Sequence, residues 1–442
     1  MTKRVDRACD LIRTDGLSGM NRRAVLGLAA GALVAAPSIV RAESPIQALQ
    51  NYQTRAEWAD RFDAAVSELN SLKGNQPTLS PSAAAQIEQA IAVYQQIVAR
   101  GGWPTLPEGV KLRLGSRDRN VAILRQRLMV TGDLAETAGR ADVFDSYVDT
   151  AVRRFQIRHG LVSDGIVGGA TLAELNVPAE QRLRQLEVNL VRVRAMSGYL
   201  GDRYVMVNIP AAEIEAVDRG VVYSRHVGVV GKIDRPSPIL SAKIQEINFN
   251  PYWHVPVSII RKDLIPKMQA DPQYLAKNKI HIYDGKGNEL LPTDIDWTTE
   301  QATQYMFRQE PGSENSMGSV KINFPNPHAV YMHDTPAKSL FGQNARFHSS
   351  GCVRVQNVRE LVAWLLSETP DWPRERVDQA IRSGERIDAR LAQPVPVYFT
   401  YITAWSTPDG LVQFRDDIYQ RDSGGAVAMN TANPDEEFVL PQ

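Results

Sequence analysis

Cysteine is almost missing from this 442-residue chain, which contains only Cys9 and Cys352. Two cysteines exclude a scaffold held by several disulfides and any zinc or iron–sulfur site that needs four thiolates. Net charge is missing too, because 50 basic residues balance 50 acidic ones. The sequence therefore gives no support for a nucleic-acid-binding protein, which usually carries a basic stripe. A hydrophobic share of 43% excludes a wholly disordered chain, and the length suggests two to three domains.

The N-terminal region is short of apolar residues for a membrane-spanning helix. Its uncharged run, Ala24–Ala36, is 13 residues long, whereas a spanning helix needs about 20. Six basic residues precede the run, Pro37 ends it, and Val40-Arg41-Ala42 places small residues where a signal peptidase cuts. This order is typical of a secretory signal.

We therefore predict a signal peptide over residues 1–42 and an exported, periplasmic protein with no stable membrane span after cleavage. The pair Arg22-Arg23 resembles a twin-arginine signal, and a general secretory signal is the other option. An uncleaved anchor and a buried helix are the alternatives to a signal. Either Met1 or Met20 could start the chain, because residues 1–19 add nothing that a signal needs.

Cleavage after Ala42 would change both the charge and the cysteine count. It would remove seven basic and three acidic residues, leaving 43 basic and 47 acidic ones. It would also remove Cys9, and an exported chain with one cysteine cannot form an internal disulfide. Cys352 is then either an accident or a reactive thiol.

The chain predicts a multidomain α+β protein. Residues 43–117 indicate a helical scaffold and linker, with one helix capped by Ser80, started by Pro81 and carrying apolar residues at helical spacing from Ile87 to Val98. Residues 118–177 predict three short helices joined by a glycine-rich loop. Residues 178–421 have the short β-branched runs of a mainly β domain. The polar residues 422–442 predict a disordered tail.

The three-helix unit has a recognisable pattern, AVRRFQ…HGL…DGIVG…TLAELN. This pattern resembles the peptidoglycan-binding domain of bacterial wall enzymes, which implies contacts with the glycan or the stem peptides of the wall. A small structural three-helix domain is the alternative.

The densest chemistry lies in residues 331–355, YMHDTPAKSLFGQNARFHSSGCVRV. A thiol becomes a useful nucleophile beside a histidine or a positive charge, provided that hydrogen-bond donors are placed to stabilise the substrate oxygen. Gly351 allows a sharp turn before Cys352, so the backbone amides of both residues can stabilise an oxyanion.

Two histidines precede the thiol. His333 ends an apolar strand signal, whereas His348 lies on the thiol's own loop. A strand end is the more rigid platform, so we expect His333 to be the base. A zinc site of His333, His348 and Cys352 would need further ligands, and none is found at convincing spacing. A buried structural thiol is the remaining alternative.

These residues resemble the catalytic motif of the L,D-transpeptidases, the YkuD-type domain. The string HDTP…LF…SSGCVRV, with NPYWHVP at 250–256 and FPN at 324–326, is similar to the large Gram-negative members. Those members combine a helical scaffold, a peptidoglycan-binding module and a catalytic domain with an inserted cap. Ser350 departs from the commonest pattern, which has histidine before the glycine, but the large members also tolerate serine.

The resemblance implies the site. Cys352 is the nucleophile, His333 the general base, Gly351 an oxyanion donor, and the main chain of Asp334 orients His333. Residues implied to contact substrate are Arg354, Tyr331, Ser350 and His348. Residues from about 257 to 328 would form the substrate cap, with helical signals near 257–276 and 299–308 and a mobile loop at 311–319. No metal and no cofactor is expected.

The implied reaction is the joining of two peptidoglycan stem peptides by a 3→3 cross-link through a thioester. The same thiol chemistry can attach a protein to the wall or hydrolyse the wall, because donor activation is identical in each case. A non-catalytic wall-binding protein is the alternative from another class. The expected partners are stem peptides, glycan and other wall-synthesis enzymes.

Overall fold

The computed structural model describes residues 74–136, 140–198 and 200–423. The predicted signal peptide, the first part of the predicted scaffold and residues 424–442 lie outside these described residues. None of the described helices is both long and apolar enough to cross a membrane.

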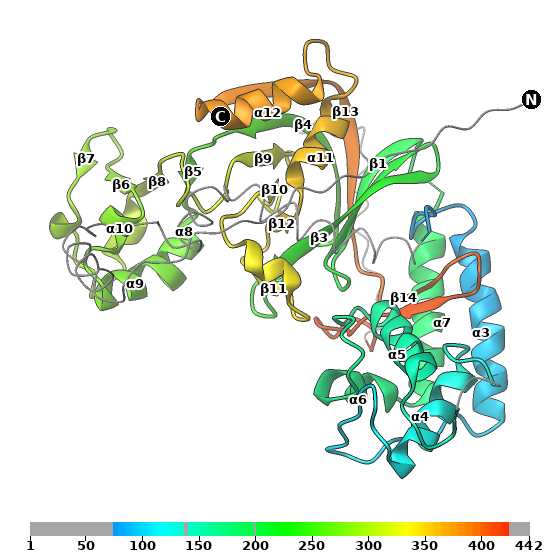
Figure 1. Cartoon of the computed structure of the whole chain (residues 1–442). Coiled ribbons are helices and arrows are strands. Elements are labelled where there is room, and N and C mark those ends of the chain that lie inside the picture. The colour runs from blue at the N-terminus through cyan, green and yellow to red at the C-terminus, as the bar shows by residue number, and fades with distance from the viewer. Residues whose placement is uncertain (1–73, 137–139, 199, 424–442) are drawn as a thin grey trace, which may run out of the picture. The chain divides into compact units, whose positions relative to one another are not determined.

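Two long helices, α3 (Ala83–Ala99) and α7 (Ala179–Met196), run side by side (Figure 1). Helix α3 buries Ile87 and Tyr94, as the helical spacing predicts. The predicted cap at Ser80 is wrong, because the helix begins at Ala83 and the Ser80 hydroxyl lies 3.1 Å from that of Ser82.

The predicted three-helix unit consists of α4 (Arg119–Val130), α5 (Ser146–Arg158) and α6 (Gly169–Leu175). Asp118 and Asp145 cap the first two helices by accepting hydrogen bonds from backbone amides. The side chain of Gln156 organises the loop that follows α5. Its amide donates to Asp164 Oδ1 at 2.6 Å, and its oxygen accepts from the Gly165 amide at 2.9 Å.

The end of α5 packs against the C-terminal hairpin, β14 (Ala404–Ser406) and β15 (Val412–Phe414). Arg158, 2% exposed, pairs with Asp133 at 2.6 Å and donates to the carbonyl of Val412. Removing one partner of such a buried pair typically costs about 3–5 kcal/mol. This arginine therefore joins the three-helix unit to the C-terminal part of the chain.

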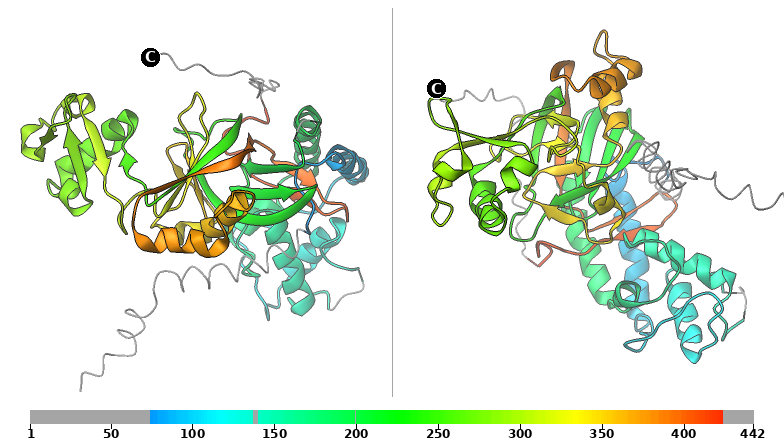
Figure 2. Two further views of the ribbon diagram at one scale, coloured as in Figure 1. Left: turned by 90° about the horizontal axis from the view of Figure 1, so that it is seen from above. Right: turned by 60° about the vertical axis from the view of Figure 1, so that its left-hand side comes forward.

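A closed ring of eight paired strands forms the main β domain (Figures 1 and 2). Around the ring the order is β3-β12-β10-β9-β4-β13-β1-β2, and β2 pairs again with β3. A ninth strand, β11 (Phe347–Ser349), pairs with β3. The ring strands are β1 (Arg203–Asn208), β2 (Glu213–Asp218), β3 (Val221–Gly231), β4 (Leu240–Phe249), β9 (Val320–Asn323), β10 (Met332–His333), β12 (Val353–Val355) and β13 (Ile387–Thr400).

Apolar residues from the strands fill the barrel, and α11 (Val358–Leu366) packs its apolar face against them. Asn357 is the N-cap of α11. A second helix, α12 (Arg374–Ser383), adds Val377 and Ala380 to the same core. The expected mainly β catalytic fold is correct.

The predicted cap is a separate unit with its own four-stranded sheet, in the order β5-β8-β6-β7 (Figure 2). Its core runs from Trp253 to Met317. The elements are β5 (Trp253–His254), α8 (Val257–Ile259), the π-helix η2 (Ile260–Leu264), α9 (Ile265–Ala270), α10 (Tyr274–Lys277), β6 (Ile280–Tyr283), β7 (Glu289–Leu290) and β8 (Met306–Gln309).

Two expectations for the cap are wrong. Only Gln301–Gln304 forms a helical turn in the stretch 299–308, and the rest leads into β8 because alternate side chains there face the cap core. The loop at 311–319 is not loose, since Asn315 is 1% exposed and donates to the carbonyl of Pro251 at 3.0 Å.

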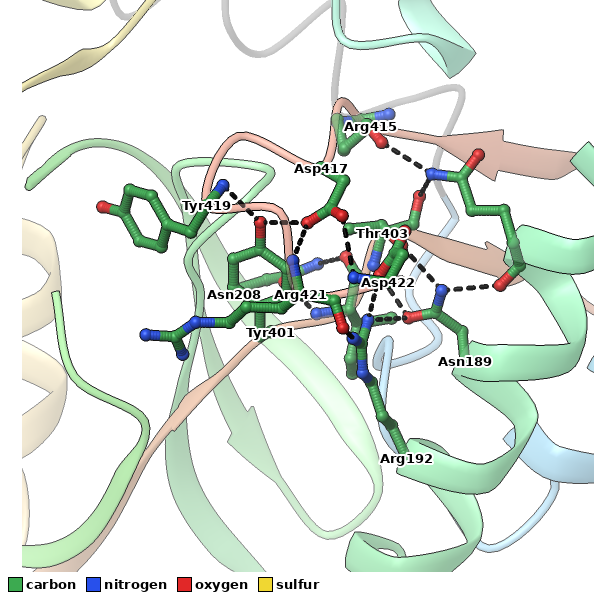
Figure 3. Close-up of polar contacts among 12 residues, drawn as sticks. Asn189, Arg192, Asn208, Tyr401, Thr403, Arg415, Asp417, Tyr419, Arg421 and Asp422 are labelled. Atoms are coloured by element: carbon green, nitrogen blue, oxygen red, sulfur yellow. Dashed lines mark hydrogen bonds and ion pairs between the residues drawn. The ribbon is translucent and has the colours of Figure 1, made fainter. Parts of the chain in front are cut away.

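The described C-terminus is held by a polar network (Figure 3). Asp422, assigned from sequence to the tail, accepts hydrogen bonds from Thr403 at 2.7 Å and from Arg192 at 2.5 Å. Asn189 on α7 also bonds Thr403 through its side chain. The ordered chain therefore extends past the predicted start of the tail, because α7 supplies partners for Asp422.

Candidate active site

The candidate site is built on two neighbouring parallel strands, β10 and β12. Met332 faces Val353 in this pairing, and His333 faces Arg354. Met332 and Val353 are fully buried in the barrel core. Because side chains alternate along a strand, the flanking positions lie on the other face of the sheet.

That face carries Tyr331 and His333 from one strand and Cys352 and Arg354 from the other. The ring centroids of Tyr331 and His333 are 5.6 Å apart. Lys321 of β9 pairs with His333 from the opposite side, and its Nζ lies 4.7 Å from the centre of the Tyr331 ring. The barrel thus gathers one thiol, one imidazole, one phenol and two cations on adjoining strands.

The Cys352 thiol is partly exposed at the surface but closely surrounded by protein. Burial raises its pKa to about 11, while hydrogen bonds from the main chain and the hydroxyl of Tyr331 and the charge of Lys321 act in the opposite direction. Desolvation outweighs these contributions, so the resting thiol is neutral near pH 7.

Tyr331 links the thiol to the cap. Its hydroxyl donates to Cys352 and accepts from the indole of Trp253, and burial raises the pKa of the phenol well above its usual value. Trp253 belongs to β5 and to the cap core. A donor chain therefore runs from Trp253 through Tyr331 to the sulfur.

His333 is 7% exposed, and burial, reinforced by the charge of Arg354, lowers its pKa to about 3. The main chain of Asp334 acts in the opposite direction by bonding the protonated ring. Nδ1 of His333 has no partner with hydrogen-bond geometry among the described residues. The imidazole is consequently neutral near pH 7 and can accept a proton.

The carboxylate of Asp334 is occupied by other groups. The amide and the hydroxyl of Ser319 each donate to it at 2.9 Å, and Lys338 forms an ion pair with it. Burial opposes its ionisation, but these partners hold its pKa below the usual value. The carboxylate is thus paired with Ser319 and Lys338, and its charge, like the main chain of Asp334, acts to raise the pKa of His333.

The turn before the thiol is shaped by serines that sequence reasoning left without a role. Gly351 has φ of +113°, which favours glycine, and its amide donates to Ser349 Oγ at 3.2 Å. The Ser349 hydroxyl donates to the carbonyl of Cys352, and Ser237 Oγ donates to that of Gly351 at 2.8 Å. The Gly351 amide, expected to hold an oxyanion, is therefore engaged by Ser349 in this state.

Ser350 connects the thiol loop to the cap. Arg235, which follows β3, donates to Ser350 Oγ at 2.8 Å and forms an ion pair with Asp263 of η2 at 2.5 Å. A π-helical turn often occurs at functional positions, and η2 supplies the carboxylate here. Arg235 was not found from sequence, because nothing in its local pattern distinguishes it from a surface arginine.

The two other implied substrate residues differ in their placement. His348 bonds Gln343 Oε1 at 3.1 Å and the carbonyl of Ala345 at 3.0 Å, so its ring is held on its own loop. Arg354 lies beside His333, and its Nε is buried without a partner among the described residues. All these residue roles stay predictions. No group of three or more His, Cys, Asp or Glu side chains in the described part of the chain could hold a metal.

Comparison with known families assigns the domains. Residues 202–378 match the family model of the L,D-transpeptidase catalytic domain, YkuD. The chain carries an L,D-transpeptidase catalytic domain. Residues 117–175 match the model of a putative peptidoglycan-binding domain, so this L,D-transpeptidase domain follows a wall-binding module.

Curated relatives agree with this assignment over part of their length. A putative L,D-transpeptidase of Haemophilus influenzae is 33% identical over 240 residues, which is 54% of this chain and 48% of the relative. The N-acetylmuramoyl-L-alanine amidase CwlM of Mycobacterium tuberculosis is 40% identical over 80 residues, 16% of this chain and 20% of that protein. The chain therefore spans about half or less of these relatives.

Solved structures match more remotely. A crystal structure of the L,D-transpeptidase from Xylanimonas cellulosilytica has 16% identity and a TM-score of 0.22, covering 66% of this chain and 99% of that one.

Tyr331→Phe removes the hydroxyl that donates to Cys352 and should raise the pKa of the thiol. A hydrogen bond to a charged group contributes about 1.5–3 kcal/mol, so alkylation of Cys352 by iodoacetamide at pH 8 should slow about tenfold or more. Peptide mass spectrometry would measure the rate at Cys352 alone. Tyr283→Phe, a cap tyrosine that accepts from Arg308, is the matched control and should react like the wild type. An unchanged rate in Tyr331→Phe would contradict the donor chain.

Arg235→Ala removes the bridge between Ser350 and Asp263. We expect faster amide hydrogen exchange both in the thiol loop, 348–352, and in η2, since each loses its shared partner. Arg261→Ala, on the same π-helix but paired with the exposed Glu300, should change neither segment. Faster exchange in only one of the two segments would show that Arg235 does not join them.

Proposed function

We propose that the catalytic domain transfers an acyl group between peptidoglycan stem peptides with Cys352 as the nucleophile. The placement of Cys352 and His333 on adjoining parallel strands is the observation that carries the proposal. The thiol proton has a neutral imidazole nearby to receive it, and the Tyr331 hydroxyl supports the developing thiolate.

In the first step, Sγ of Cys352 attacks the carbonyl carbon between diaminopimelate and D-alanine in a tetrapeptide stem. The thiol proton moves to His333, and the oxyanion forms near the amides of Gly351 and Cys352. The Gly351 amide would break its hydrogen bond to Ser349 Oγ and donate to the substrate oxygen instead. His333 then protonates the departing amine, and D-alanine leaves as a thioester forms.

In the second step, the amine of another stem attacks the thioester carbonyl. His333 accepts the amine proton and returns it to the sulfur, which restores the thiol and gives a 3→3 cross-link. Because the resting pair is neutral, formation of the thiolate must accompany attack. A closed cap that excludes water would favour the amine over water as acceptor.

The product mixture from tetrapeptide fragments tests this proposal. We expect mass spectrometry to detect released D-alanine and a cross-linked dimer with the full chain, and neither with Cys352→Ala. His333→Gln should lower turnover at least a hundredfold, within the range of general base catalysis. Arg219→Ala, an exposed arginine on the β2–β3 turn, is the control and should retain activity.

Other outcomes assign other functions. D-alanine without a dimer would indicate hydrolysis, and dimers only with an added protein amine would indicate attachment of a protein to the wall. Muropeptide binding with no product, together with failure of Cys352 to be acylated by a carbapenem, would favour a non-catalytic wall-binding protein.

We also propose that the protein works in the periplasm, where this polymer is reached after export. The signal-like order of residues 1–42 supports this location. N-terminal sequencing of the protein from a cell-envelope fraction should find Glu43 first. A chain that still begins at Met1 or Met20 would contradict cleavage.

A further inference from the structure

A cavity of about 560 Å³ lies on the catalytic domain and includes none of the candidate active-site residues. Its walls come from β3, from α11 and from the segment that joins α11 to α12. Sites for small molecules commonly have volumes of about 300–1,000 Å³. Neither the acyl-transfer chemistry nor the peptidoglycan-binding module uses this cavity.

Aromatic rings form two of its walls. Tyr223 is 58% exposed and stacks on Trp364, with ring centroids 6.0 Å apart and planes at 26°. Trp372 is partly exposed and stacks on the buried Phe249 at 5.2 Å and 7°. Each wall is thus an aromatic ring held in place by a second ring beneath it.

Polar groups complete the lining. Glu360 is partly buried, which raises its pKa, and the Asn357 side chain fixes one of its oxygens at 2.8 Å. Asp371 is exposed and has the unusual φ of +64°. Trp364 is 3% exposed, and its Nε1 is a buried donor without a partner among the described residues. Arg374 adds a guanidinium donor to the lining.

We propose that this cavity binds a neutral pyranose sugar. A pyranose has an apolar C–H face that can lie on the exposed ring of Tyr223, and hydroxyls that can donate to Glu360 and Asp371 and accept from Arg374. The repeating sugars of the wall glycan have this chemistry. The catalytic domain would then bind the glycan directly, in addition to the wall-binding module. This binding does not depend on the acyl-transfer reaction.

An ammonium group also suits aromatic rings with carboxylates, but the cavity favours it less. An ammonium has no acceptor for the guanidinium donors of Arg374. Arginines already occupy the relevant positions, because Arg203 lies 4.4 Å from the Trp364 ring centre and Arg376 lies 5.6 Å from that of Trp372. Arg374 lines the cavity itself and would repel a second cation.

Indole N–H signals in nuclear magnetic resonance spectra of the full ¹⁵N-labelled chain test the proposal. The probes are chitotetraose, cellotetraose and lysinamide, and Trp364→Phe and Trp372→Phe assign the two signals. We expect both signals to move with a tetrasaccharide at millimolar concentration. If the Trp364→Phe variant does not fold, the indole signal of the surface residue Trp372 is sufficient for the test. Tighter binding of chitotetraose would assign the sugar to wall glycan, and tighter binding of cellotetraose to an unsubstituted glucan.

Tyr223→Ala should weaken the tetrasaccharide affinity about five- to tenfold, which corresponds to the loss of one aromatic contact. Val93→Ala is the control, because Val93 is 53% exposed but lies on α3, outside both the wall-binding module and the cavity lining. Signals that move only with lysinamide, signals that move with no probe, or an unchanged affinity in Tyr223→Ala would overturn the proposal. These readouts use no turnover, so they stand apart from the test of the acyl-transfer reaction.

Discussion

The parallel pairing of β10 with β12 is the constraint on which the candidate site depends. The two strands meet over only two residue pairs, yet this register places Cys352 beside Tyr331 and Arg354 beside His333. Met332 and Val353 fix the register, because a slip of either strand by one position would turn its apolar side chain out of the core and its candidate site residues into it. The ring of strands is closed, which leaves neither strand free to shift along an edge.

Burial has opposite consequences for the two reacting groups. It raises the pKa of the thiol and lowers that of the imidazole, so both are neutral in the resting state. The protein therefore does not keep a preformed thiolate beside an imidazolium. Lys321 and Arg354 favour the thiolate but disfavour the imidazolium, and substrate binding must bring the remaining stabilisation. This arrangement lowers the reactivity of the thiol towards oxidants, since the thiolate is the reactive form.

Sequence patterns predict the parts of this protein that depend on local order. The motif around Cys352, the three-helix unit and α11 are each visible as a short string or an amphipathic period. The register that brings Lys321 beside His333 is not local, because β9 and β10 are joined by an irregular segment. Arg235 and Ser237 act on the thiol loop over more than 110 positions in the chain. Sequence periodicity does not identify such residues, because their contacts with the thiol loop form only in the folded barrel.

Two connections make the cap part of the site. Trp253 reaches the sulfur through Tyr331, and Asp263 reaches the thiol loop through Arg235 and Ser350. Ser350, where the commoner pattern has histidine, accepts the hydrogen bond from Arg235 through its hydroxyl. A cap that moves away would remove one donor from Tyr331 and the carboxylate partner from Arg235. The contacts of the cap therefore contribute to the electrostatic surroundings of the thiol loop.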